Sequence, residues 1–502
     1  MSAFPPLPLG QRIPALPHAV SCSLPRMEDV RGYEEKKPET MRHLTSGYPR
    51  FVVHPFTRQL IAHFTATLPA LKGRTLWLTS SARLAGRLAS HLGAAPADAQ
   101  IFSHGSLNGV THVESPEVGA RAKTFLQNIG GFLPSREAED HLVRLGLLDA
   151  SHAERSFPGD AAAEVRGVLH RALPETSDAD LLLANCGMNA IYAAFRASAD
   201  LQAARGRTVW LQLGWLYLDT IAILKKFTTT PADYVYVRDA LDLEGIERIF
   251  TKHGGQIAGV FAELPTNPLM QTPDVVALSS LCRRHGAHLI VDPSVASVFN
   301  VDVLRHCDAV VSSLTKYTAS EGDLTAGLIA INPAGRDATE LRRRATAELE
   351  PVYPRDLARL AAQIGETESV LATIHANTAA VAAFLGQHPK VRDVYWALHP
   401  ASRDNYLRLA RSPEATGGMI TFTLRGPMEP FYDRLRLPKG PSFGMKTTLI
   451  CPFMYLAHYD LVTTPAGIAE LAASKLDPDL LRLCCGAEPG AEIIAALAEA
   501  LG

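Results

Sequence analysis

The stretch that decides the fold is residues 257–332, which contains the short apolar runs IAGVFAEL (257–264), AHLIVD (287–292), AVVSSL (309–314) and AGLIAIN (326–332). Each run has the length of a buried strand. The helical-looking segment TPDVVALSSLCRRHG (272–286) separates the first two runs. Apolar strands that alternate with amphipathic helices predict an α/β fold with a mostly parallel sheet that is covered on both faces.

The same pattern extends toward the N-terminus through TVWLQL (208–213) and YVYV (234–237). The sheet should therefore occupy about residues 180–332. In such sheets ligands bind beyond the carboxyl ends of the strands. We expect the functional residues at these strand ends.

Two of these strand ends carry ionisable side chains. Asp292 closes AHLIVD, and Lys316 follows AVVSSL. A carboxylate that keeps a pyridine nitrogen protonated and a lysine that forms an imine are what pyridoxal 5'-phosphate (PLP) chemistry requires. Taken singly, each residue has an ordinary explanation, because lysines are usually solvated and an aspartate after a strand commonly caps a turn. Their joint placement favours a PLP site.

Residues of three further motifs fit the same site. Gly187 and Met188 follow the apolar run LLLAN, where a helix start can hold a phosphate on its N–H groups. Tyr217 follows TVWLQL and has a ring that can stack on a flat cofactor, and Asn267 follows IAGVFAEL. Each has a structural alternative, namely a packing glycine, a core tyrosine and a turn asparagine.

Composition excludes several other classes of protein. The 502 residues include 49 Lys and Arg and 51 Asp and Glu, so the formal net charge is −2. The protein therefore has no excess of basic residues with which to bind nucleic acid or membranes. The seven cysteines show no metal or disulfide spacing. The opening MSAFPPLPLG lacks the basic and apolar parts of a secretory signal, and no apolar run of about 18–20 residues stands out. We expect a cytoplasmic protein that binds small molecules and no metal.

The chain divides into three expected parts. Residues 1–55, rich in proline and charge, form an N-terminal arm, for which plain disorder is an equal alternative. Residues 56–350 form the large domain, with an inserted helical segment at about 60–180. Residues 351–502 form a smaller α/β domain that contains the strand-like VRDVYW and MITFTL.

These motifs together resemble a known family. GMNAI, YLDT, ELPTNP, LIVD, SSLTKY and LLRLCCGAE occur in the order found in the cystathionine gamma-synthase-like group of PLP enzymes. The N-terminal residues 8–35 and SGYPRFVVHP (46–55) are similar to the fungal-type cystathionine gamma-synthases. The resemblance implies PLP-dependent transferase fold type I, the aspartate-aminotransferase fold.

The resemblance also implies roles for individual residues. Lys316 would carry PLP and move protons, Asp292 would pair with the pyridine nitrogen, and Tyr217 would stack on the ring. Arg482 would clamp the substrate α-carboxylate, with Thr448 beside it. The other implied cofactor contacts are the phosphate ligands Gly187, Met188, Ser313 and Thr315, Asn267 near the ring hydroxyl, and Tyr48 and Arg50, which would reach across a dimer interface to the neighbouring subunit's phosphate.

Several positions depart from the family. Cys186 stands where the family has serine before Gly-Met, and Pro293-Ser294 replaces Asn-Thr after the aspartate. The Gly-His pair that usually follows the lysine is absent, since the chain continues Tyr317-Thr318-Ala319-Ser320-Glu321-Gly322-Asp323. An insertion of roughly a hundred residues separates Arg50 from the Gly-Met motif. The substrate side is thus less typical than the cofactor side.

The activity that the resemblance implies is γ-replacement, in which an O-acylhomoserine and cysteine give cystathionine in methionine biosynthesis and transsulfuration. The same residues would serve γ- or β-elimination, or replacement by sulfide or a carbon nucleophile. A non-catalytic scaffold with the same fold is a further alternative, although it would have no need of Lys316, Asp292 and Arg482 together. The family implies a homodimer or homotetramer.

Overall fold

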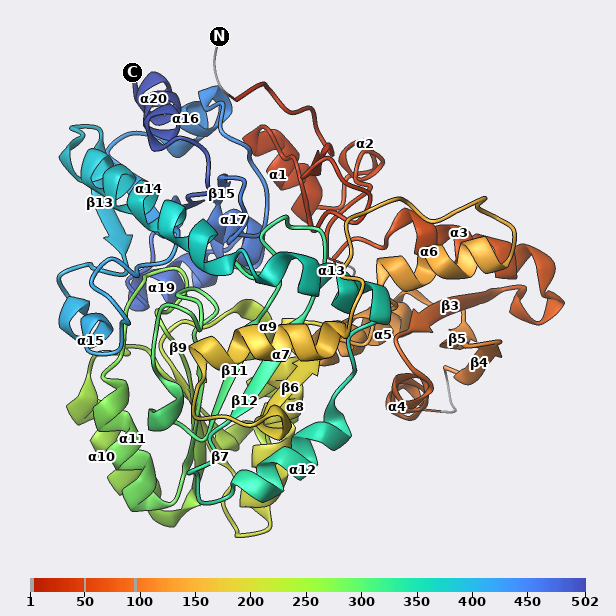
Figure 1. Cartoon of the computed structure of the whole chain (residues 1–502), viewed down its shortest axis with the longest axis horizontal. Helices are drawn as coiled ribbons and strands as arrows, with labels where there is room; N and C mark the ends of the chain where they lie inside the picture. Colours follow the sequence, from red (N-terminus) through yellow and green to blue (C-terminus); the bar gives the residue numbers. More distant parts are fainter. Residues whose placement is uncertain (1–3, 49–50, 94–96) are drawn as a thin grey trace.

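The computed structural model describes residues 4–48, 51–93 and 97–502. Its centre is a seven-stranded sheet of order β6-β12-β11-β10-β9-β7-β8, in which β12 alone runs antiparallel to its neighbours. The strands are β6 (Leu181–Ala184), β7 (Val209–Leu213), β8 (Tyr234–Val237), β9 (Ile257–Glu263), β10 (His288–Asp292), β11 (Ala309–Ser313) and β12 (Gly327–Ile331). The predicted, mostly parallel sheet is confirmed (Figure 1).

Both faces of this sheet are buried, which explains why its strands are continuously apolar. In β7, Val209, Leu211 and Leu213 belong to one hydrophobic core, and Trp210 belongs to the core on the opposite face. One face is covered by helices α7 (Ala161–Ala172), α10 (Leu243–His253), α11 (Val275–His285) and α13 (Pro354–Ile364). The other is covered by α8 (Gly187–Ala203), α9 (Leu218–Phe227) and α12 (Ala338–Glu348).

The C-terminal part contains a four-stranded antiparallel sheet of order β13-β14-β16-β15. Its strands are β13 (Val391–Trp396), β14 (Met419–Leu424), β15 (Leu449–Pro452) and β16 (Leu481–Cys484). Helices α14 (Thr367–Gln387), α16 (Met428–Arg434) and α20 (Gly490–Leu501) pack on it (Figure 1). Arg482, the predicted substrate-binding arginine, lies on β16 of this sheet.

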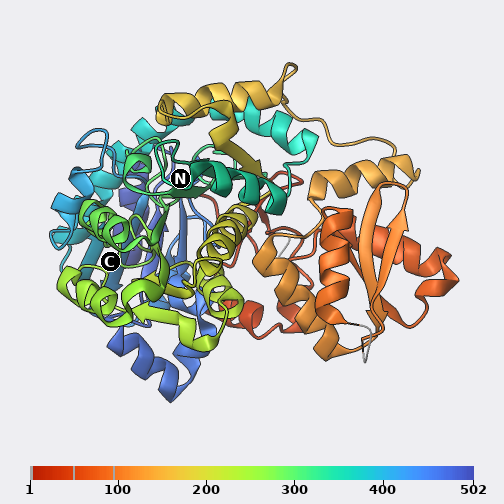
Figure 2. The ribbon, with the colours of Figure 1, turned by 90° about the horizontal axis from the view of Figure 1, so that it is seen from below.

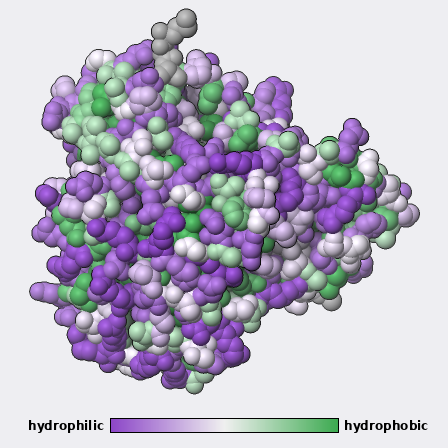
Figure 3. Space-filling view, in the orientation of Figure 1, coloured by the Kyte–Doolittle hydropathy of each residue, from purple (hydrophilic) through white to green (hydrophobic). Residues whose placement is uncertain are grey.

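Helix α14 is the one helix of the described residues that is long and apolar enough to be compared with a membrane span. By length and composition it is apolar enough to cross a membrane, because only Glu368 in its 21 residues is charged. Its side chains Leu371, Ile374, Val381 and Leu385 are buried in the cores of the protein. We therefore assign α14 to the packed interior. The face of the molecule in Figure 3 is mainly hydrophilic, with small apolar areas scattered over it.

The N-terminal arm is packed rather than extended. Strands β1 (Arg12–Ile13) and β2 (Ser21–Cys22) form a two-stranded antiparallel pair, followed by helices α1 (Met27–Glu34) and α2 (Pro38–Met41). Leu24, Met27 and Val30 are fully buried in the same core as Phe422 and Leu497 of the C-terminal part. The arm thus shares a core with residues more than 390 positions away.

The inserted segment, which the sequence predicts to be mainly helical, also holds a small sheet. Residues 55–147, which we call the N-terminal α/β unit, contain a three-stranded antiparallel sheet of order β3-β5-β4 (Figure 2). The elements are α3 (Pro55–Thr67), β3 (Arg74–Thr79), α4 (Ala82–Leu92), β4 (Gln100–His104), β5 (Leu107–Val113), α5 (Pro116–Ile129) and α6 (Ser135–Arg144). Strand β4 buries only Phe102, so its sequence offers no apolar run to mark it.

A buried arginine joins this unit to the rest of the chain. Arg136, in α6, is fully buried and donates to Asp356 at 2.7 Å, to Asp323 at 3.1 Å and to Glu154 at 2.7 Å. Asp356 lies in α13, and Asp323 lies in the loop that follows Lys316. One guanidinium therefore connects α6, α13 and the lysine loop.

We predict that Arg136→Met lowers the free energy of unfolding by about 3–5 kcal/mol, because it leaves buried carboxylates without their cation. The measurement is the midpoint of urea unfolding followed by circular dichroism. Arg144→Met, in the same helix but exposed, is the matched control. Equal midpoints for the two variants would show that the buried network contributes nothing to stability.

Candidate active site

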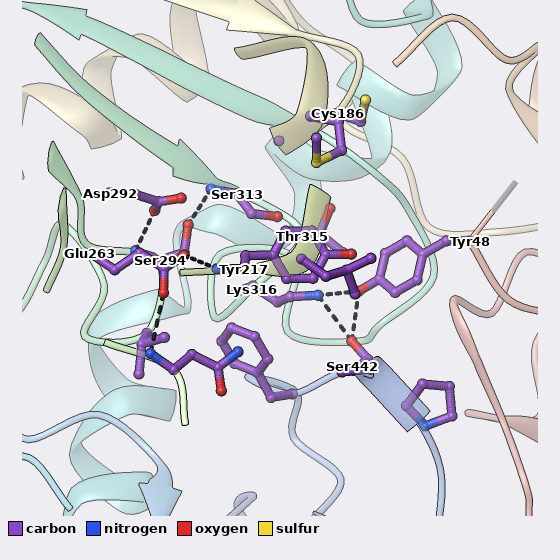
Figure 4. A pocket seen from close by; sticks show the side chains of 18 of the residues that line it. Tyr48, Cys186, Tyr217, Glu263, Asp292, Ser294, Ser313, Thr315, Lys316 and Ser442 are labelled. Carbon is purple, nitrogen blue, oxygen red and sulfur yellow. Dashed lines mark hydrogen bonds between the residues drawn. The ribbon is translucent and has the colours of Figure 1, made fainter. Parts of the chain in front are cut away.

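The predicted strand ends meet in one cavity of about 140 Å³ between the seven-stranded sheet and the C-terminal part. Figure 4 shows that Asp292, at the end of β10, Tyr217, after β7, and Ser313 and Lys316, at the end of β11, reach it. The predicted residues that line the cavity are Tyr48, Gly187, Met188, Tyr217, Asn267, Asp292, Ser313, Thr315, Lys316 and Arg482. Sequence positions from 48 to 482 thus converge on one chamber.

Two carboxyl groups lie side by side at its floor. Asp292 ends β10 and is directly paired in register with Glu263, which ends β9. The backbone N–H of Ser294 donates to Asp292 at 2.8 Å. Burial raises the pKa of Asp292 to about 6, against the opposing effect of the Ser294 hydrogen bonds. A carboxyl group in this environment favours a cation as its partner.

Glu263 was not singled out by the sequence analysis. Its carboxyl oxygens accept the backbone N–H of Tyr217 at 2.5 Å and that of Asn267 at 3.2 Å. Burial, and then the charge of Asp292, raise the pKa of Glu263 well above its usual value. This buried side chain holds the two predicted ring contacts in place. The sequence could have indicated Glu263, because this residue ends its strand just as Asp292 does.

The start of α8 forms a cradle at another wall. A Cβ atom added to Gly187 would lie 2.9 Å from Cβ of Ser313, so only glycine fits this close approach. The hydroxyl of Ser294, a residue without a sequence signal, accepts the N–H of Ser313 at 2.7 Å. Thr315 accepts the N–H of Ala326 at 3.1 Å. The helix N-terminus and these hydroxyl groups suit an anion such as a phosphate.

Lys316 meets two hydroxyl groups across the cavity. Its Nζ donates to the hydroxyl of Tyr48 and, at 3.1 Å, to that of Ser442. These two hydroxyl groups are themselves 2.7 Å apart (Figure 4). Ser442 carried no signal in the sequence because it lies in a loop.

Tyr48 lies at the cavity of its own chain, where its hydroxyl accepts from Lys316. Its predicted contact with a neighbouring subunit's phosphate stays a prediction. Arg50, the other residue of the predicted pair, lies outside the described residues.

The substrate side contains Arg482 but not Thr448. Arg482, in β16, donates to the backbone carbonyl of Ser442 at 3.2 Å, and its guanidinium lies 4.8 Å from the ring centre of Phe453. Thr448 is fully buried and does not line the cavity. Its hydroxyl donates to Glu488 at 2.7 Å, so it supports the loop behind Arg482. The predicted substrate contact of Thr448 is therefore replaced by an internal hydrogen bond.

The residues present fit PLP. Among the described residues, Nε of Arg482 and Oδ1 of Asn267 are buried without a hydrogen-bond partner, as expected for groups that await a ligand. The lysine amine, the buried Asp292 and the glycine cradle occupy one chamber. Lys316 would hold the aldehyde carbon, Asp292 the ring nitrogen, and the start of α8 the phosphate.

Comparisons with known proteins agree with this assignment. A sequence model of the family of Cys/Met metabolism PLP-dependent enzymes matches residues 165–502. An L-2-amino-4-chloropent-4-enoate dechlorinase/desaturase of Streptantibioticus cattleyicolor is 39% identical over 95% of this chain and 94% of its own length. A cystathionine gamma-synthase of Neurospora crassa is 26% identical over 99% of this chain and 98% of its own.

A solved structure shows the same fold. The cystathionine gamma synthase of Xanthomonas oryzae pv. oryzae, in complex with cystathionine, has a TM-score of 0.58 and is 21% identical. The match covers 70% of this chain and 89% of that one. The expectation of fold type I is confirmed.

Asp292 generates a pH-dependent prediction. Its raised pKa means that the folded protein holds this proton more tightly than the unfolded chain does. The contribution of this proton to the free energy of unfolding is about 3 kcal/mol. It is fully present below pH about 4 and is lost as the pH rises through about 6. Asp292→Asn has the same size and stays neutral. Its Tm without cofactor should exceed that of the wild type by a margin that grows from about pH 4.5 to about pH 7.

Differential scanning fluorimetry measures this margin, with the exposed Asp404→Asn as the control. PLP should remove the margin, because a protonated ring nitrogen gives the Asp292 carboxylate its partner. Parallel curves for wild type and Asp292→Asn across the pH range would contradict the assignment of Asp292 as the buried, titrating group.

Proposed function

The chain belongs to the family of Cys/Met metabolism PLP-dependent enzymes, and we propose that its reaction is an elimination on the side chain of one L-amino acid. The resemblance to fungal-type cystathionine gamma-synthases is confirmed at the level of the family, and the protein is a PLP-dependent enzyme. The substrate we propose has an apolar side chain that carries a leaving group such as chloride.

The observation that carries this proposal is the lining of the cavity. The described lining of the cavity contains two acidic side chains, Asp292 and Glu263, and two basic ones, Lys316 and Arg482. Because Lys316 is assigned to the cofactor, Arg482 is the one basic side chain of this lining that is left for a substrate. The remaining walls include the apolar side chains of Phe51, Ile191, Val295, Pro441, Phe443, Phe453 and Leu456. One guanidinium suits one α-carboxylate, and the apolar walls suit a side chain without charges.

Cysteine as a second substrate would meet these walls with a second carboxylate and a second ammonium group. A buried polar group without a partner costs about 1–3 kcal/mol, and a charged one costs more. The described lining offers no further guanidinium for that carboxylate. This argument favours elimination over the γ-replacement that the family resemblance first implied.

The Lys316 amine supports the proton movements of an elimination. Arg482 would bind the α-carboxylate, and the Lys316 amine would take the proton from the α-carbon and later return it. Tyr217 and Asn267, held by Glu263, would keep the ring in place. PLP, when bound, supplies the electron sink for the carbon that loses its proton. The net loss is H⁺ from a carbon next to the C–Cl carbon and Cl⁻, so one C–H and one C–Cl bond break, one carbon–carbon π bond forms, and no oxidant is needed.

Replacement with cysteine remains the second candidate, because the Neurospora relative aligns over nearly its whole length. A direct competition decides between the two reactions. With L-2-amino-4-chloropent-4-enoate we expect release of chloride in step with an amino acid that has one more unsaturation. With O-acylhomoserine and cysteine we expect a kcat/KM for cystathionine that is at least about 100-fold lower, corresponding to about 3 kcal/mol. Faster formation of cystathionine would overturn the proposal in favour of γ-replacement.

Arg482→Lys tests the carboxylate clamp. Lysine keeps the positive charge but loses the two-pronged geometry, so kcat/KM should fall by about 10- to 100-fold. The visible absorbance of bound PLP should not change, because Arg482 is proposed to hold the substrate. The exposed Arg436→Lys, in the same part of the chain, is the control. An unchanged kcat/KM for Arg482→Lys would remove Arg482 from the substrate site.

Lys316 is tested by borohydride reduction of the PLP-loaded protein and peptide mapping. We expect the visible band to collapse and the label to appear on the peptide that contains Lys316. Lys316→Ala should give neither band nor label. A label on any other lysine would displace the catalytic assignment.

A further inference from the structure

The start of helix α8, which forms the glycine cradle of the cavity, packs against the N-terminal α/β unit. Helix α5 of this unit ends at Gly130, whose φ of 69° is a left-handed conformation that favours glycine. A Cβ atom added to Gly130 would lie 2.6 Å from Sγ of Cys186 and 2.8 Å from the backbone nitrogen of Asn189. A side chain at position 130 would therefore push the end of α5 and the start of α8 apart.

Two buried asparagines hold this contact from the side of α8. The side-chain amide of Asn185 donates to the carbonyl of Gly130 at 2.9 Å, and that of Asn189 donates to the carbonyl of Ile129 at 3.0 Å. The last carbonyls of a helix have no partner within the helix, so these amides supply donors that the end of α5 needs. The two asparagines flank residues 186–188, which line the cavity.

A buried carboxylate ties the unit to the same asparagine. Glu350 is 1% exposed and accepts the hydroxyl groups of Ser80 at 2.7 Å and Ser81 at 3.1 Å, which lie between β3 and α4. The backbone N–H of Glu350 donates to Oδ1 of Asn189 at 2.7 Å. The amide of Asn189 is thus held at its nitrogen by Ile129 and at its oxygen by Glu350, which fixes the first turn of α8.

A second contact connects the unit to the tyrosine that lines the cavity. Gln127, in the last turn of α5, donates to Asp219 at 2.7 Å, and Asp219 accepts the hydroxyl of Tyr217 at 3.3 Å. Asp219 is 1% exposed and lies in the first turn of α9. The neighbouring Asn128 accepts the amine of Lys226, in the last turn of α9, at 2.9 Å. The end of α5 is therefore joined to both ends of the helix that follows Tyr217.

We propose that the N-terminal α/β unit is part of the PLP site. The turn at Gly130 fixes the start of α8 for the phosphate, and Gln127, acting through Asp219, fixes the Tyr217 ring. None of the described residues of the unit lines the cavity, so Gly130 and Gln127 are positioning residues. The inference requires only that the protein binds PLP, and it holds for elimination and replacement alike.

The phosphate end is tested by comparing PLP with pyridoxal, which lacks the phosphate but can still bond to Lys316. In Gly130→Ala the affinity for PLP should fall by about 10- to 100-fold and that for pyridoxal by less than about 3-fold, because the displaced helix start contacts the phosphate alone. Both affinities are measured by titrating the cofactor-free, full-length protein and following the visible absorbance. A general loss of stability would instead weaken both compounds equally.

Gly146→Ala is the matched control. Gly146 lies in the same unit and has a φ of 67°, and an added Cβ atom would meet nothing within 4 Å among the described residues. This variant has the same kind of backbone strain without the contact, so its ratio of PLP to pyridoxal affinity should equal that of the wild type. An unchanged ratio in Gly130→Ala would overturn the proposal for the phosphate end.

Asn185→Ala provides a second test of the phosphate end in case Gly130→Ala does not fold. It removes one donor to the Gly130 carbonyl and adds no atoms, so the ratio of PLP to pyridoxal affinity should fall by about 5-fold. If Asn185→Ala binds the two compounds in the wild-type ratio, the unit does not position the phosphate.

The ring end is tested with Gln127→Leu, which removes the donor to Asp219 at nearly constant size. The affinities for PLP and pyridoxal should fall together by about 5-fold, because both compounds contain the ring. In a Tyr217→Phe background Gln127→Leu should have no further effect, since the hydroxyl through which it acts is gone. The exposed Thr124→Leu in α5 is the control. Losses that simply add in the double variant, or no loss in Gln127→Leu, would reject this role of Gln127.

Discussion

A carboxylate held away from water at the end of β10 is the constraint on which the site depends. Asp292 is buried, with a pKa raised by that burial, and a buried charge without a partner costs several kcal/mol. The protonated ring nitrogen of PLP would remove this cost and gain its own stabilisation. Burial, and then the charge of Asp292, raise the pKa of Glu263 as well, which disfavours two adjacent negative charges. The cofactor and the buried strand end therefore depend on each other.

The sequence predicts the parts of this protein that follow from local pattern. The apolar runs predicted the sheet, and the first polar residues after them predicted Asp292 and Lys316, because strand ends in a parallel sheet share one edge. Tyr48 and Ser442 could not be predicted in the same way, since their contact depends on how the arm packs. Thr448 does not line the cavity for a similar reason, because its hydroxyl donates to Glu488 instead. Strand β4 was missed because Phe102 is its only buried side chain.

The loop after Lys316 explains how a large insertion coexists with an active site. The chain lacks the family's Gly-His pair there, and Asp323 instead accepts from Arg136, Arg359 and Gln363. These three donors come from α6 and α13. The N-terminal α/β unit thus contributes to the position of the lysine loop through charge-assisted hydrogen bonds, which are shorter and stronger than neutral ones.

Elimination and replacement begin with the same proton transfer, so the walls of the cavity decide between them. Phe443 and Phe453 lie 5.4 and 4.8 Å from the guanidinium carbon of Arg482. In the proposed reaction these rings would shield the ion pair between Arg482 and the substrate carboxylate from water, which would strengthen it. The apolar walls would then favour a chlorinated or unsaturated side chain, which gains by burial, over a second amino acid, which would lose its hydration. The same walls would thus support binding of one substrate carboxylate and disfavour a charged nucleophile.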